Sequence, residues 1–197
     1  TKTHPFSLIQ DCFNAGITAM GENRIQEASQ KFESFADMPN LTRRFIGHLQ
    51  SNKVNKCLEL FDTIDSVDSL KLAKKISNAA MRLEKTIPVL LEINTSGEVQ
   101  KHGFLPDQIN EIEACFNEIN IKIEGLMTIG PRTTDLEKIR KSFIQLRELR
   151  DSINQSIKQA NMRVLSMGMS GDYEIAVEEG STMVRLGTAL FGARNIK

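Results

Sequence analysis

Small and hydroxyl-bearing residues follow two short apolar segments near the C-terminus. Residues 164–167 and 183–186 have the composition of short strands; Ser170 follows the first, and Gly187 and Thr188 follow the second. Backbone N–H groups in such turns, together with hydroxyl groups, can bind a phosphate. The pattern therefore predicts a phosphate site of the kind found at the carboxyl end of an α/β barrel. From the residues alone, the same glycine and serine could also be ordinary turn residues.

The chain as a whole alternates strand-like and helical patterns, which favours a parallel sheet with helices packed on it. The strand-like segments are residues 19–22, 44–47, 63–66, 88–94, 121–127, 164–167 and 183–186. Helical periodicity is clear over residues 6–15, 69–82, 108–117 and 135–154. We interpret residues 1–197 as one domain with a (β/α)8 TIM barrel fold. Because only seven strands can be counted, we expect the first strand to lie upstream of residue 1.

Composition argues against several classes of partner. Lys plus Arg and Asp plus Glu are 25 each, so no overall charge attracts nucleic acid or an anionic membrane. Cys12, Cys57 and Cys115 are odd in number and widely spaced, which suits reduced thiols rather than disulfides or a metal cluster. There is neither a signal-like N-terminus nor an apolar run long enough to span a bilayer. These features indicate a soluble, cytoplasmic protein.

A series of motifs in chain order resembles one known family. They are TKTHP at residues 1–5, GENRIQEA at 21–28, RFIGHLQSNK at 44–53, TIDSVDS at 63–69, EINTSGEVQKHGF at 92–104, EGLMTIGP at 124–131 and the stretch 165–194. The chain is similar over essentially its whole length to the pyridoxal-phosphate homeostasis proteins, also called the proline synthase co-transcribed family. Their fold is that of the N-terminal domain of alanine racemase, an α/β barrel.

The resemblance implies a pyridoxal 5'-phosphate site. Lys2 matches the family's Schiff-base lysine, and Ser170, Gly187 and Thr188 match its phosphate-binding residues. Gly168 and Met169 are expected to shape the same loop. Taken by itself, Lys2 would be assigned as an ordinary surface lysine. Only the TKTHP motif supports its role in cofactor binding.

Two further positions are implied to contact the cofactor ring. Arg185 matches an arginine that faces the pyridine nitrogen; because a guanidinium has no acceptor, it would keep that nitrogen unprotonated and weaken the cofactor as an electron sink. Arg185 could instead pair with a barrel carboxylate such as Glu22 or Glu92. Asn23 is implied to lie under the ring, near the phenolic oxygen. It could also be a turn or N-cap residue for the following helix.

Other polar residues near predicted strand ends have weaker support. Asn94, His48 and Lys101 could line the barrel mouth, but we assign none of them a catalytic role. The family usually has a histidine where this chain has Arg44. That difference leaves the role of position 44 open.

Three functional hypotheses follow. The first is a monomeric, non-catalytic protein for pyridoxal phosphate and amino-acid homeostasis, which could deliver the cofactor to apo-enzymes. The second is an amino-acid racemase. Racemases take their second base, a tyrosine, from a domain absent here, and the chain's only tyrosine, Tyr173, is poorly placed to replace it. The third is a barrel enzyme acting on another phosphate compound, with Glu22 or Glu92 as a candidate general base.

Overall fold

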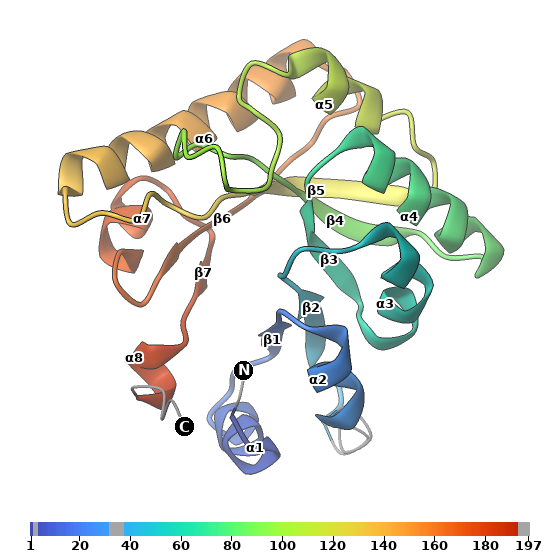
Figure 1. Cartoon of the computed structure of the whole chain (residues 1–197), viewed down its shortest axis with the longest axis vertical. Helices are drawn as coiled ribbons and strands as arrows, with labels where there is room; N and C mark the ends of the chain where they lie inside the picture. The colour runs from blue at the N-terminus through green and yellow to red at the C-terminus, as the bar shows by residue number, and fades with distance from the viewer. Residues whose placement is uncertain (2–3, 32–37, 193–197) are drawn as a thin grey trace.

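Seven parallel strands curl into an incomplete barrel in the computed structural model, which describes residue 1, residues 4–31 and residues 38–192. Each strand pairs with the next along the chain, so the spatial order is the sequence order (Figure 1). The strands are β1 (Ala19–Glu22), β2 (Thr42–Phe45), β3 (Thr63–Val67), β4 (Ile87–Glu92), β5 (Ile121–Met127), β6 (Val164–Met169) and β7 (Met183–Arg185). All seven predicted strands are confirmed, with ends that differ by at most a few residues.

Helices lie on the outside of the sheet (Figure 1). They are α1 (Phe6–Asn14), α2 (Ile25–Lys31), α3 (Val54–Leu60), α4 (Leu70–Arg82), α5 (Ile109–Cys115), α6 (Leu136–Ser156), α7 (Tyr173–Glu178) and α8 (Thr188–Phe191), with a 3-10 turn at Ser51–Lys53. Helices α2 to α7 connect successive parallel strands, whereas α1 precedes β1 and α8 follows β7. Within the described residues, no helix combines the length and apolarity needed to cross a bilayer.

Helix α6 illustrates how the sequence determines the packing. Its N-cap, Asp135, accepts hydrogen bonds from the amides of Glu137 and Lys138. The apolar residues at helical spacing then face the sheet and are buried, namely Ile139, Phe143, Leu146, Leu149 and Ile153. Leu136 has the same helical spacing but is 63% exposed, because it lies in the first turn of the helix.

The barrel is open between its first and last strands. Among the described residues, β1 pairs only with β2 and β7 only with β6. Helices α1 and α8 lie at this open side (Figure 1), where the rings of His4 and Phe191 stack with centroids 4.6 Å apart. The expectation of an additional strand upstream of residue 1 stays a prediction.

Candidate functional site

The predicted phosphate residues come together at the rim between β6 and α8. The Ser170 hydroxyl accepts hydrogen bonds from the backbone N–H groups of Gly187 and Ala189, both at 3.1 Å. Thr188 lies between these two amides at the start of α8 and is exposed. The structure therefore places Ser170, Gly187 and Thr188 in one cluster, with two amides directed at a single oxygen atom.

The turn after β6 positions Ser170. Gly168 has φ +92°, and a Cβ there would lie 2.5 Å from the Cβ of Ala176 in α7, so this position requires glycine. The side chain of Asp172 then accepts from the amide of Met169 at 2.6 Å, which closes the turn. The prediction that Gly168 and Met169 shape this loop agrees with the geometry.

Arg185 points across the interior of the barrel mouth from the end of β7. Its Nη1 donates to the carbonyl and hydroxyl oxygens of Ser166 at 2.8 and 2.7 Å, and its Nη2 donates to the Thr128 carbonyl at 2.7 Å. Burial lowers the pKa of this guanidinium, and nearby Asp65 is the leading charge that opposes the effect.

The alternative that Arg185 pairs with Glu22 or Glu92 is not borne out. Among the described residues, neither carboxylate lies within ion-pair distance of it. Glu22 instead pairs with the Nζ of Lys31 at 2.9 Å. Ser166 and Thr128, which hold Arg185, were missed by the sequence analysis. Nothing in a strand's own sequence shows which distant carbonyl a long side chain will reach.

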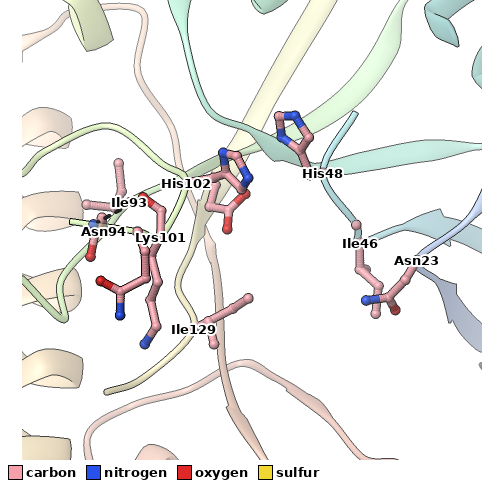
Figure 2. Close-up of a pocket in the computed structure, with 11 residues that line it drawn as sticks. Asn23, Ile46, His48, Ile93, Asn94, Lys101, His102 and Ile129 are labelled. Atoms are coloured by element: carbon pink, nitrogen blue, oxygen red, sulfur yellow. Dashed lines mark hydrogen bonds between the residues drawn. The ribbon is translucent and has the colours of Figure 1, made fainter. Parts of the chain in front are cut away.

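A cavity of about 230 Å³ lies at the carboxyl ends of the strands, and Asn23 lines it (Figure 2). Its other lining residues include His48, Asn94 and Lys101, as expected, together with Glu92 and His102. Asn23 is exposed and lies directly after β1. Its placement fits a contact with a ligand in the mouth.

Glu92, at the end of β4, contributes a carboxyl group with a shifted pKa to this cavity. Burial and, to a smaller extent, the charge of Asp68 raise its pKa to about 7, while the charge of Arg185 opposes the shift. Its side chain is 7% exposed and forms no hydrogen bond with any described residue.

Arg44, the residue that departs from the family pattern, has a structural partner. Its Nε and Nη2 donate to the two carboxylate oxygens of Asp65 on the neighbouring strand, at 2.7 and 3.2 Å. Both side chains are largely buried. Position 44 therefore contributes an ion pair to the barrel interior.

Lys2 lies outside the described residues, so its role stays a prediction. Its described neighbours contact the open side of the barrel. The backbone nitrogen of Thr1 donates to the Gly21 carbonyl at 2.7 Å, at the carboxyl end of β1, and His4 stacks on Phe191 of α8.

Comparisons with known proteins agree with this architecture. Residues 2–195 match the family described as alanine racemase, N-terminal domain. Alanine racemase from Clostridium difficile superposes with a TM-score of 0.78 at 19% identity, covering 97% of this chain and 48% of that one. At that identity the likeness concerns the fold alone.

More similar proteins match along nearly the whole chain. A pyridoxal phosphate homeostasis protein of Aquifex aeolicus is 42% identical over 98% of this chain and 85% of its own length. PipY of Synechococcus elongatus superposes with a TM-score of 0.92 at 37% identity, covering 96% of this chain and 89% of that chain. A second PipY structure, with pyridoxal phosphate bound, has a TM-score of 0.87 at 36% identity, covering 97% and 89%. From these matches and its seven-stranded barrel, the chain belongs to the pyridoxal phosphate homeostasis proteins, within the family of alanine racemase N-terminal domains.

Proposed function

We propose that this protein binds pyridoxal 5'-phosphate at the barrel mouth and serves in the homeostasis of that cofactor and of amino-acid pools. The observation that carries the proposal is the pair of amides, those of Gly187 and Ala189, that converge on the Ser170 hydroxyl. These donors fit the oxygens of a phosphate, and the Thr188 hydroxyl adds a further donor beside them. Relatives at 36–42% identity carry the corresponding name, and one was solved with the cofactor bound.

The ring end of the cofactor would lie toward Arg185. When bound, the cofactor supplies an aldehyde that reacts with amines and a ring that can accept electrons. Arg185 has only donors and cannot accept a proton from the ring nitrogen. The nearest carboxylates act on it through charge rather than through hydrogen bonds. An arginine there favours storage of the cofactor over extensive carbanion chemistry.

The remaining assignments belong to the same proposal. Lys2 supplies the amine that holds the aldehyde covalently, Asn23 contacts the ring from the β1 side, and the chain acts as a single-domain, cytoplasmic monomer without turnover of its own. Apo-enzymes that need the cofactor are the proposed recipients.

A racemase activity is the second candidate, supported by the shared barrel. Its second base would have to be Tyr173. That hydroxyl lies on α7 and donates to Glu174 at 3.3 Å, and Tyr173 does not line the cavity that contains Asn23. The position gives no support to a role in proton transfer.

The first experiment is the absorbance spectrum of the chain with pyridoxal phosphate, before and after borohydride reduction. Wild type should show a band that reduction fixes covalently, and Lys2→Ala should lose it. Lys56→Ala, which removes an exposed lysine of α3, is the matched control and should behave as wild type. A band that persists in Lys2→Ala would contradict the covalent assignment. Loss of an amino acid's α-deuterium to water would favour the racemase instead.

A further inference from the structure

Three potential metal ligands meet at the rim of the barrel, on loops that follow β2, β3 and β4. The Nδ1 atoms of His48 and His102 lie 3.2 and 4.0 Å from the same carboxylate oxygen of Asp68, its Oδ2. The three ligand atoms all lie within 4.8 Å of one another. The two imidazole rings face each other with centroids 3.8 Å apart and planes 11° from parallel, and Figure 2 shows them side by side.

The surrounding hydrogen bonds orient these side chains. Asp68 uses its other oxygen, Oδ1, to accept from the Ser69 hydroxyl at 3.0 Å, which leaves Oδ2 toward the two rings. The loop that carries His102 is fixed by Lys101, whose Nζ donates to the Gly130 carbonyl at 2.7 Å. Hydrogen bonds of this kind, beyond the ligands themselves, are typical of metal sites because they set ligand orientation.

A buried carboxylate lies beside the cluster. Glu92 lines the same cavity as His48 and His102 and is 7% exposed, and its side chain has no hydrogen-bond partner among the described residues. A cation bound at the cluster would therefore have a further carboxyl group in the same cavity.

We propose that His48, Asp68 and His102 form a binding site for a divalent transition-metal ion of the Zn²⁺ class. Two imidazole nitrogens and one carboxylate oxygen are a ligand set that suits zinc, with the fourth position left to water. Ligands about 2.0–2.2 Å from zinc lie roughly 3.3 Å apart in a tetrahedron, so the three atoms must draw together slightly. Both histidine side chains are about half exposed, at 45% and 56%, and can rotate to direct their nitrogens at one point.

The proposed ligands include none of the residues assigned to pyridoxal phosphate, although His48 and His102 line the same cavity as Asn23. The cysteine thiols are poor competitors for the metal. Cys57 and Cys115 are buried, and burial raises the pKa of both, that of Cys115 to about 12. Cys12 is half-buried and far away in the sequence, so its contribution can be removed by Cys12→Ser.

Titration calorimetry with Zn²⁺, and the visible spectrum with Co²⁺, test the proposal on the Cys12→Ser chain. Because pyridoxal phosphate can itself complex metals, both measurements are made with and without it. We expect one ion per chain in both conditions and Co²⁺ bands typical of nitrogen and oxygen ligands. Loss of a supporting residue typically weakens metal binding about tenfold to a hundredfold, so His48→Ala, Asp68→Asn and His102→Ala should each cost about a hundredfold or more.

His4→Ala is the matched control, because it removes the chain's third histidine, which stacks on Phe191 away from the cluster. It should bind Zn²⁺ as tightly as the parent chain. Circular dichroism of each variant checks that the barrel is folded. Binding that survives His48→Ala with His102→Ala, or that requires pyridoxal phosphate, would overturn the proposal. So would the absence of binding, in which case the two rings and Asp68 are a hydrogen-bonded surface cluster only. These measurements test the metal site independently of the cofactor proposal, which is tested by borohydride reduction at Lys2.

Discussion

Arg44 and Asp65 form a two-point ion pair between neighbouring strands, β2 and β3, inside the barrel. Asp65 is completely buried and also accepts a hydrogen bond from the Thr63 hydroxyl at 3.0 Å. Its charge acts on a second arginine as well, since it opposes the lowering of the Arg185 pKa by burial. Asp65 therefore links the residue that departs from the family pattern with the arginine proposed to face the cofactor ring.

Removal of Arg44 should destabilise the barrel strongly. Arg44→Ala leaves the Asp65 carboxylate buried without its main partner, and loss of one member of such a pair costs about 3–5 kcal/mol of unfolding free energy. Urea denaturation measures the effect. Arg24→Ala, which breaks an exposed pair with Glu27, should cost at most about 1 kcal/mol. If the two variants lose the same unfolding free energy, the buried ion pair stabilises the barrel no more than the exposed one.

Ser170→Ala should weaken binding of pyridoxal phosphate but not of pyridoxal, which lacks the phosphate. A hydrogen bond to a charged group contributes about 1.5–3 kcal/mol, equivalent to roughly a tenfold to hundredfold change in dissociation constant. Absorbance titrations with the two ligands give the ratio of affinities. The control is Ser29→Ala, whose hydroxyl donates to the Gln26 carbonyl on α2. If Ser170→Ala weakens both ligands equally, its effect is on the fold rather than on the phosphate.

Glu92 should make the protein less stable as pH rises from about 4.5 to about 7. Burial raises its folded-state pKa to about 7, whereas an unfolded glutamate titrates near pH 4.3. Between these values the folded chain binds more protons than the unfolded chain, so its free energy of unfolding falls with increasing pH. Glu92→Gln should therefore gain stability relative to wild type across this range.

Thermal unfolding of Glu92→Gln and wild type measures this difference in stability. A chelator in the buffer prevents interference from metal ions. Glu148→Gln alters an exposed carboxylate of α6 and should leave the pH dependence unchanged. If the difference in melting temperature between Glu92→Gln and wild type stays constant from pH 4.5 to 7, the assigned pKa is contradicted.

The sequence predicted the strands and the phosphate loops well because both depend on local patterns. The apolar runs of β4 and β5 and the Gly and Ser of the last two loops are visible in the chain itself, and periodicity located α4 and α6 to within two residues at each end. The short helix α3 was not predicted: it has seven residues, its N-cap has no side-chain hydrogen bond, and its stability comes from packing of Val54, Cys57 and Leu58.

Contacts between distant strands were harder to predict. The hydrogen bonds of Arg185 to Ser166 and Thr128 span 19 and 57 residues, and the meeting of His48 with His102 depends on loops that follow two different strands. Strand order and register fix such pairs, and neither is encoded locally. The local sequence around His102 therefore does not indicate its contact with His48, although a parallel barrel places both loops on the same rim.

Gly47→Ala should disturb the rim of the barrel where the loop after β2 passes Asn23. A Cβ at Gly47 would lie 2.2 Å from the backbone oxygen of Asn23, a contact that no rotamer can relieve because both sides are backbone. The strands β1 and β2 would have to separate at their carboxyl ends, which shifts Asn23 and His48 together. We expect a loss of about 1–3 kcal/mol in unfolding free energy, as for other overpacked positions, with weaker pyridoxal phosphate binding.

The matched control is Gly171→Ala in the loop after β6, where a Cβ would meet nothing within 4 Å. Urea denaturation and cofactor titration of both variants separate the two outcomes. If Gly47→Ala behaves like Gly171→Ala, the rim can yield at this point, and the positions of Asn23 and His48 do not depend on the close approach of β1 and β2.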